Sequence, residues 1–428
     1  IKKEITALQE SGVGIVDSAL LSRQMQESTI ERELIQRAKD EEKRTRSQGV
    51  RDVMRRLVAG EAYIDFMPLD SVYAALVITA EESKIITLNT EEKLSSELNF
   101  VMDFIEGNKS DAELALSIAY ETFWSPLARQ LQGVSTLYLN PDGAYVGMNL
   151  GVLVNPETGR YLMDEIALRY VSSISDVVNG NAKPLKSNRE EGQAILFGDP
   201  AFSSSVLLVQ DSRQVTQGAV KPLPFTRIEV NEVGDQLKVS GWNVKNHLGK
   251  SASEENLASV QAPELLHIAT HGFFLSPSSQ LPTRNQNPEM NNPMFRSGLL
   301  LSGANDVGAE QQAVLNKKGW FTAAECSNLE LNGTELVVLS ACETGRGKLQ
   351  AGRGAFGLQR AFRIAGADAV LLSMWSVDDL VTSQLMVRFY EHWLDGNSAS
   401  EALELAQQEI RKQYPHPYYW GAWICYGD

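Results

Sequence analysis

Two apolar segments late in the chain each run into a reactive side chain, and their setting constrains the fold most. ELLHIAT (264–270) is followed by His271, and ELVVLSA (335–341) is followed by Cys342. Further apolar segments and helical patterns alternate around them, the segments at 194–198, 241–247, 369–375 and 422–427 and the patterns at 227–237, 253–259, 353–365, 380–394 and 399–413. Apolar strands alternating with helices are typical of a largely parallel sheet covered on both faces. The sequence therefore predicts an α/β fold with a mostly parallel sheet flanked by helices.

His271 and Cys342 would project from the same rim if their strands are parallel neighbours, because functional groups gather at the carboxyl edge of such sheets. A free thiol, with a pKa near 8.5, is only a few per cent thiolate at neutral pH, and an adjacent imidazole raises that fraction and later protonates a leaving amine. The backbone N–H groups of Gly272 and Cys342 would stabilise the oxyanion of a tetrahedral intermediate. The residues thus predict a catalytic Cys–His dyad that requires no metal and no cofactor.

Each of these residues has a simpler interpretation. A cysteine at the end of an apolar strand is usually a small buried hydrophobe, and a lone histidine is usually a hydrogen-bonded structural residue, as we expect of His267. Zinc binding by His267 and His271 is disfavoured because strand positions four apart lie roughly 13 Å from each other. The Gly-rich stretch 345–357 lacks the GK[ST] ending of a phosphate-binding loop and indicates a flexible loop instead. The Pro- and Asn-rich segment 276–296 is a cleavage site, an activation switch or an insertion.

Composition excludes several classes of protein. There are 39 Lys and Arg against 54 Asp and Glu, a net charge of −15, which argues against nucleic-acid binding. The three cysteines, Cys326, Cys342 and Cys425, lie far apart without a CxxC pair, which suits a reducing cytoplasm. There is no apolar run of about 18 residues, so no membrane association is expected. The chain begins with Ile1 and a charged segment, which indicates a piece of a longer protein rather than a secretory signal.

The change in periodicity along the chain predicts three parts. Residues 1–57 are helical, and they are either the end of a helical array or a solvated helix with charge pairs four residues apart. Residues 58–190 form a separate α/β unit, with strands at 62–69, 73–79, 84–88 and 135–139, a helical stretch at 92–132 and a linker at 179–192. Residues 191–428 contain His271 and Cys342.

At the residues of the dyad the sequence resembles the CHAT family, a group of caspase-like cysteine peptidases of the clan that contains separase. The matching segments are LLHIATHGFF, FRSGLLLSGAN, LVVLSACETGRG, GRGAFGLQRAFRIAGADAVLLSMWSVDD and YYWGAWICYGD, with AILFGDPAF and FWSPLARQLQGVSTLYLNPDGAYVGMNLGVLV upstream. The resemblance implies a catalytic His271 and Cys342. It also implies that the unit before residue 190 is an inactive protease-like or scaffold half, and that tetratricopeptide repeats commonly precede the domain.

The resemblance further implies a function. The chain would be a cysteine endopeptidase that cleaves a specific protein substrate after a basic residue, in bacterial signalling or defence, with a protein activator docking on the N-terminal helical region. In Arg- or Lys-selective relatives an acidic residue beyond the strand after the nucleophile strand lines the pocket for the residue preceding the cut. Asp379, and second Asp378, occupy that place, although an Asp there also commonly caps a helix. The alternatives are a non-catalytic scaffold that binds a partner and a latent protease that needs an activator.

Overall fold

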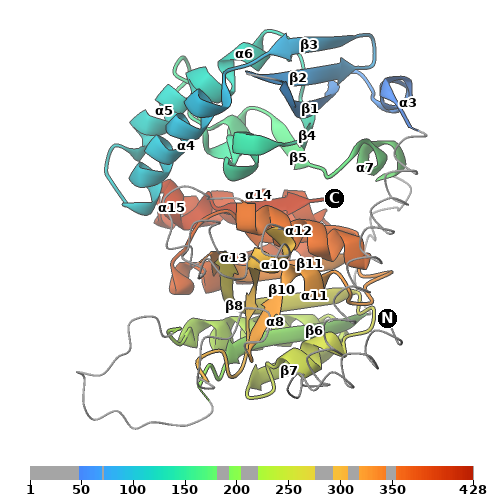
Figure 1. The fold of residues 1–428 in the computed structure, drawn as a ribbon, viewed down its shortest axis with the longest axis vertical. Helices are drawn as coiled ribbons and strands as arrows, with labels where there is room; N and C mark the ends of the chain where they lie inside the picture. The colour runs from blue at the N-terminus through green and yellow to red at the C-terminus, as the bar shows by residue number, and fades with distance from the viewer. Residues whose placement is uncertain are drawn as a thin grey trace, which may run out of the picture. The chain divides into compact units, whose positions relative to one another are not determined.

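The computed structural model describes residues 48–69, 72–180, 192–203, 220–274, 293–306, 318–343 and 353–427 (Figure 1). The helix predicted for residues 1–57 therefore lies largely outside the described residues, apart from α3 (Val50–Arg56). Most of the predicted linker, most of the segment 276–296 and the first part of the Gly-rich stretch also lie outside them. None of the helices in the described ranges combines the length and apolar character that a membrane crossing requires.

The first part of the described chain, residues 48–180, contains the strands predicted there and one more. Its strands are β1 (Glu61–Leu69), β2 (Val72–Thr79), β3 (Ser83–Thr87), β4 (Thr136–Asn140) and β5 (Ala167–Tyr170). Its remaining helices are α4 (Glu91–Glu106), α5 (Ala112–Phe123), α6 (Ser125–Ala128), α7 (Ile174–Asn179) and the 3-10 helices η1 (Gly143–Gly147), η2 (Leu150–Val152) and η3 (Leu162–Asp164). β1 pairs with β2 and β2 with β3 in antiparallel fashion, whereas β1, β4 and β5 run parallel.

The helical stretch predicted at 92–132 is three helices rather than one. Asn108 has a φ of 48°, the left-handed conformation that commonly ends a helix, and it follows Gly107, the C-cap residue of α4. Pro126 then stands in the first turn of α6, where its missing N–H costs nothing. α4 and α5 pack against each other as a helical pair (Figure 1).

The second part, residues 192–427, supplies the strands that carry the predicted dyad. Its strands are β6 (Gln193–Pro200), β7 (Asn243–Gly249), β8 (Leu265–Phe274), β9 (Ser297–Leu300), β10 (Trp320–Thr322), β11 (Leu336–Glu343), β12 (Ala369–Ser373) and β13 (Trp423–Tyr426). Its helices are α8 (Pro224–Val239), α9 (Glu254–Ala258), α10 (Pro293–Arg296), α11 (Ala323–Cys326), α12 (Arg353–Ala365), α13 (Asp379–Leu394), α14 (Ala399–Gln413) and α15 (Pro417–Trp420).

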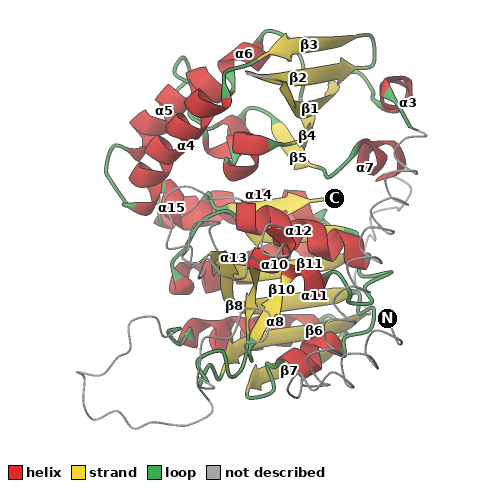
Figure 2. Ribbon diagram, viewed as in Figure 1, coloured by secondary structure: helices red, strands yellow, loops and turns green. Residues whose placement is uncertain are grey.

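Parallel strands form the middle of this part, as the sequence predicts. β7, β6, β8, β11 and β12 follow one another in parallel, and β13 joins β12 in antiparallel fashion. Residues 265–273 of β8 are all buried, which requires cover on both faces of the sheet. α8 packs over β6 and β7 and against α13, while α12 packs over β12 and β9 (Figure 2). The predicted α/β fold with a mostly parallel, helix-flanked sheet is confirmed.

One sheet spans both parts within the described residues. Its order is β10-β9-β8-β11-β12-β13-β5-β4-β1-β2-β3, with β6 joined to β8 and β7 to β6. The two parts meet where Tyr426 of β13 pairs with Tyr170 of β5. The sequence did not predict β5, β9 or β10, each of which has only three or four residues and therefore shows too little alternation to be recognised.

Candidate active site

His271 and Cys342 occupy neighbouring positions on adjacent strands. β8 and β11 pair in parallel from Leu265 and Leu336 onward, and in this register His271 is the partner of Cys342. Register partners on adjacent strands lie on the same face of a sheet, with the strands about 4.8 Å apart. The backbone thus brings the two residues of the predicted dyad together near the carboxyl ends of their strands.

β8 changes partner just before His271. Its first half pairs in parallel with β6 as far as Ile268, and its last four residues, from His271 on, pair in antiparallel fashion with β9. The hydroxyl of Thr270 donates a hydrogen bond to the carbonyl of Leu300, which fixes β9 against β8 at the changeover. His271 is therefore held in a strand ladder on both sides, by β9 and by β11, and this rigid backbone sets the starting position of its ring.

The imidazole of His271 is oriented by one backbone carbonyl. Its Nε2 atom lies 2.8 Å from the carbonyl oxygen of Lys221, which comes just before α8. A carbonyl oxygen only accepts, so Nε2 carries the proton in this hydrogen bond. In the neutral ring Nδ1 then holds the free lone pair, and this buried atom has no hydrogen-bond partner among the described residues. The arrangement leaves the basic nitrogen of the ring available.

Burial keeps this imidazole neutral near pH 7. Only 8% of His271 is exposed, and the ring of Phe202 lies 5.5 Å from its ring, centroid to centroid. Removal from water disfavours the charged form and lowers the pKa of His271, while the hydrogen bond to Lys221 opposes this weakly. A neutral, tautomerically fixed imidazole is the form in which histidine acts as a general base.

Lys221 was not a candidate in the sequence. Its contribution is a backbone carbonyl, which every residue possesses, so no residue type marks the position. Its side chain is exposed and plays no part in the contact. Only the path of the chain before α8 identifies it.

Asp378 and Asp379 have different roles at the start of α13. Asp378 is the N-cap residue, and its carboxylate accepts a hydrogen bond from the backbone N–H of Val381 at 3.0 Å. Capping, the alternative considered for one of this pair, is thus what Asp378 does. Asp379 is the first helical residue, and its carboxylate accepts from the backbone N–H of Phe225 at 3.2 Å, in the first turn of α8.

The carboxylate of Asp379 is half-buried among other acids. Its pKa is raised to about 6, mainly by burial and to a smaller extent by the charges of Glu229, Asp378 and Asp199, while the Phe225 N–H opposes the shift. Asp379 and His271 both contact the segment 221–225, at its two ends. An extended chain of that length spans at most about 14 Å, so Asp379 lies in the neighbourhood of the dyad.

The remaining candidates are placed as follows. Gly272 lies within the sheet, where it pairs with Glu343 of β11 and Leu299 of β9, and its role in an oxyanion hole stays a prediction. Cys326 and Cys425 are buried and form no disulfide within the described residues, and burial raises the pKa of Cys326 well above its usual range. Both therefore suit the packing role expected of them.

His267 lies in the core, four residues before His271 on β8. It is fully buried, its Nε2 lies 3.0 Å from the carboxylate of Glu229 on α8, and its Nδ1 lies 3.0 Å from the hydroxyl of Tyr390 on α13. This matches the structural role that the sequence suggested for His267. Nothing in the sequence indicated Glu229 or Tyr390 as its partners.

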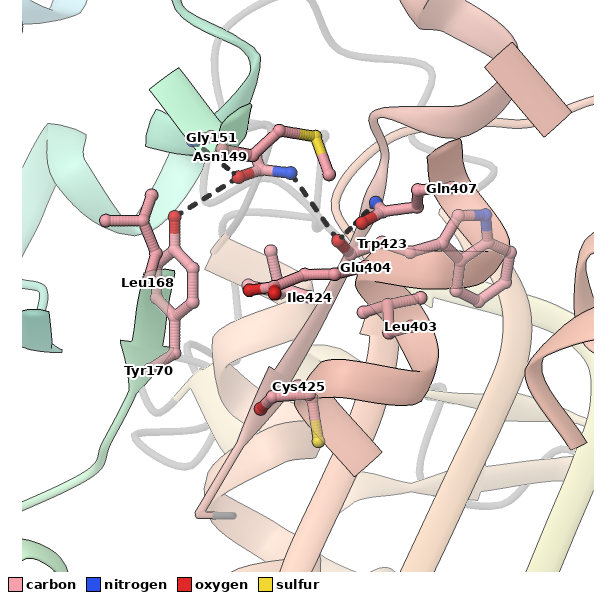
Figure 3. Close-up of a pocket in the computed structure, with 12 residues that line it drawn as sticks. Asn149, Gly151, Leu168, Tyr170, Leu403, Glu404, Gln407, Trp423, Ile424 and Cys425 are labelled. Carbon is pink, nitrogen blue, oxygen red and sulfur yellow. Dashed lines mark hydrogen bonds between the residues drawn. The ribbon is translucent and has the colours of Figure 1, made fainter. Parts of the chain in front are cut away.

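A small cavity lies away from the dyad, where the two parts of the chain meet. It holds about 30 Å³ and is bordered by η2, β5, α14 and β13 (Figure 3). The buried amide of Asn149 crosses it: its nitrogen donates to the carbonyl of Gly421 at 2.7 Å, and its oxygen accepts from the N–H of Gly151 and the hydroxyl of Tyr170. A cavity of this size holds about one water, so it is no substrate site.

Comparison with protein families identifies the chain. The model of the CHAT domain family matches residues 114–428, which include both strands of the dyad. The chain belongs to the CHAT domain family. The match also includes β4 and β5, so part of the unit that precedes residue 190 falls within this CHAT domain.

Mammalian relatives of this CHAT domain are much longer proteins. Human tetratricopeptide repeat protein 28 is 25% identical over 319 residues, and the alignment covers 71% of this chain but 12% of that protein. The mouse protein of the same name is 29% identical with the same coverage. The chain thus spans about an eighth of the length of the curated relatives it matches.

Two solved structures are similar to it at low sequence identity. The Arg-specific cysteine proteinase gingipain R aligns with 79% of this chain and 73% of its own, at 9% identity and a TM-score of 0.40. The Saccharomyces cerevisiae separase in its complex with securin aligns with 88% of this chain and 31% of its own, at 11% identity and a TM-score of 0.48.

Proposed function

We propose that this CHAT domain is a cysteine endopeptidase in which Cys342 is the nucleophile and His271 the acid/base partner. The observation that supports this most is the register of β8 and β11, which pairs the two residues. The hydrogen bond from His271 Nε2 to the Lys221 carbonyl adds to it, because it leaves Nδ1 as the basic nitrogen.

The reaction follows from these groups. His271 Nδ1 takes the proton of the Cys342 thiol, and the thiolate attacks the carbonyl carbon of the scissile peptide bond. Backbone N–H groups, with Gly272 and Cys342 as the first candidates, stabilise the oxyanion that forms. The intermediate collapses, the C–N bond breaks and the imidazolium returns its proton to the leaving amine. Water then enters and gives a proton to His271 while its oxygen attacks the acyl carbon. The C–S bond breaks, the acid product leaves and His271 returns the proton to the sulfur of Cys342.

Cleavage after a basic residue is the second part of the proposal. Asp379 is half-buried beside the segment that contacts His271, and its charge has few opposing cations nearby, since the neighbouring groups that influence it electrostatically are acids. A guanidinium or ammonium group of the substrate would pair with this carboxylate and displace no existing ion pair. Uncharged side chains would leave the carboxylate desolvated and unpaired, and would therefore bind worse.

A labelling experiment tests both parts. A peptidyl electrophile with Arg at the position before the reactive group should modify Cys342 and spare the buried Cys326 and Cys425, as peptide mass spectrometry would report. The same electrophile with Leu in place of Arg is the matched control. Cys342→Ala should abolish labelling and peptide cleavage, whereas Cys425→Ala should retain both. Equal labelling by the Arg and Leu reagents would reject the basic preference, and cleavage by Cys342→Ala would reject the enzyme.

A latent protease is the second candidate function. A protein activator bound to the N-terminal helical region would then be needed to complete the site. The proposal also assigns this protease to bacterial signalling or defence. The alignment covers only 12% of the human relative. Most of that protein therefore lies outside the CHAT domain and could regulate it, which supports this proposal. Labelling that is slow in the chain alone and fast after an activator protein is added would distinguish it from a constitutive enzyme. A scaffold without chemistry would stay unlabelled in both.

A further inference from the structure

A glutamate, a histidine and a tyrosine form a buried contact beneath the dyad. Glu229 on α8, His267 on β8 and Tyr390 on α13 are all fully buried, and they join the sheet to both helices that cover this face. Glu229 and His267 are in contact at 3.0 Å, and the carboxylate has no well-aligned hydrogen-bond partner among the described residues. Burial and the charge of Glu229 raise the pKa of Tyr390 well above its usual range, so its hydroxyl stays protonated.

Stability alone gives little reason for these residues. Taking polar side chains out of water costs free energy that their mutual contact only partly returns, and apolar residues of similar volume often replace such a buried contact without loss of stability. A polar contact in this place is instead suited to fixing one relative position of packed elements. Apolar side chains can slide past each other, whereas a contact between Glu229 and His267 has one favourable arrangement.

The position fixed by this contact is that of the first turns of α8. Glu229 lies one helical turn after Phe225, which donates to Asp379. Lys221, whose carbonyl orients His271, lies in the segment that leads directly into this first turn. His267 and His271 lie on the same face of β8, since strand positions an even number apart share a face. A shift of α8 along β8 would therefore move the Lys221 carbonyl relative to the His271 ring.

We propose that Glu229, His267 and Tyr390 are positioning residues for the dyad. They fix the position of α8 along β8 so that the Lys221 carbonyl accepts the hydrogen bond from His271 Nε2. This hydrogen bond keeps Nδ1 as the basic nitrogen. None of the three touches substrate. This inference rests on the proposed Cys–His function and adds to it the device that sets the histidine tautomer. Displacements of about 1 Å in such a site can cost about 10²-fold in rate.

The test uses iodoacetamide, because alkylation of Cys342 reports its thiolate without knowledge of the substrate. The rate at Cys342 is followed by peptide mass spectrometry from pH 5 to 10 in the whole protein. Tyr390→Phe removes the hydroxyl and keeps the ring. Tyr145→Phe is the matched control: Tyr145 is also buried, and its hydroxyl donates to the carbonyl of Phe123 in the first part of the chain.

We expect Tyr390→Phe to shift the pH profile of Cys342 alkylation toward that of a free thiol, whose midpoint lies at about pH 8.5. The alkylation rate at pH 7 should fall roughly tenfold. Tyr145→Phe should lower thermal stability by a similar amount and leave the profile in place. A folded Tyr390→Phe protein with the wild-type profile would overturn the inference, and so would an equal shift in both variants.

Two further variants separate the ways in which the idea can fail. The double variant Glu229→Met/His267→Leu replaces the polar contact by apolar volume and should fold, yet show the shifted profile. If it folds and alkylates as the wild type does, the contact is only structural. His271→Ala must shift the profile as well. An unchanged profile in His271→Ala would refute the dyad itself, and with it the proposed function, whatever the core variants show.

Discussion

The carbonyl oxygen of Lys221 lies 2.8 Å from Nε2 of His271 and fixes which ring nitrogen is basic. The contact joins the segment before α8 to the carboxyl end of β8, so the histidine is oriented by a backbone group rather than by an acidic side chain. Such an acceptor carries no charge and does not titrate. Burial is therefore the main influence on the pKa of this imidazole.

The acid limit of activity follows from the lowered pKa of His271. Burial shifts this pKa below its usual value near 6.5, so the ring stays neutral and able to accept the thiol proton down to more acidic pH than an exposed histidine would. We expect the acid limb of kcat/KM for a peptide substrate to lie below pH 6.5. The same shift makes the folded state bind protons less readily than the unfolded chain, so this group lowers stability as pH falls through 6.5. His392→Gln, a change at a histidine that pairs with Glu409 at the end of α13 opposite to Asp379, should leave the limb in place.

Asp379→Asn should raise the stability of the protein and remove its preference for Arg in the labelling reagent. The raised pKa, about 6, means that ionising this carboxylate costs more in the folded protein than in the unfolded chain, and the cost appears as pH rises through 4 to 6. Because the group is half-exposed, solvent screening reduces the effect, and we expect Asn to stabilise the protein at pH 8 by about 1 kcal/mol and not at pH 4. Urea unfolding at both pH values measures this. The variant should also lose the preference for Arg over Leu in the labelling reagent. A loss of stability at pH 8 would contradict the assignment of the shift.

Asp378 gives the contrasting case. Its carboxylate caps α13 through the Val381 N–H, so Asp378→Ala should destabilise the fold by about 1 kcal/mol, the usual cost of losing a cap. Asp378→Asn keeps a capping oxygen and should stay within a few tenths of a kcal/mol of the wild type. Neither variant should change the Arg preference as Asp379→Asn does. A larger change of preference in Asp378→Asn than in Asp379→Asn would reverse the proposed order of the pair.

The sequence predicted the elements of the sheet better than their connections. The strands before His271 and Cys342 are continuous apolar segments with β-branched residues, and such segments are recognisable because the strands are buried on both faces. Three-residue strands such as β10 offer no such signal. The proposed dyad requires β8 and β11 to be neighbours. The sequence could state this requirement but could not predict that it is met. The pairing of His271 with Cys342 depends on register, a property of long-range packing that local periodicity does not contain.

The candidate site was predictable where residue type marks it and unpredictable where the backbone or the core supplies it. His271, Cys342, Asp378 and Asp379 are all side chains of reactive or acidic type, and the sequence singled them out. The Lys221 carbonyl has no identifying side chain. Glu229 and Tyr390 lie on helices at positions where a surface or apolar role is the ordinary expectation, and only the approach of α8 and α13 to His267 brings them together.

The junction between the two parts of the chain yields the last prediction. Asn149 makes hydrogen bonds to the carbonyl of Gly421 and from the hydroxyl of Tyr170, and it is 5% exposed. Asn149→Ala would remove the donor to the Gly421 carbonyl and the acceptor for the Tyr170 hydroxyl, which keeps the N–H of Leu150 as a donor. A buried group that loses its partner costs about 1–3 kcal/mol, so we expect a loss of stability of about 3 kcal/mol in urea unfolding. Asn256→Ala, which removes an exposed hydrogen bond to the carbonyl of Ser251, is the control and should cost less than about 1 kcal/mol.

The effect of Asn149→Ala should also reach the dyad. β13 follows Gly421, pairs with β12, and β12 pairs with β11, so the strand that carries Cys342 is two strands away from the junction. If the first part of the chain braces this edge of the sheet, Asn149→Ala should raise amide hydrogen exchange in β13 and β12 before it does so in β6 and β7. Uniform exchange across all of these strands would instead mean that the sheet opens as one unit, and that the first part contributes stability without favouring the strands nearest to it.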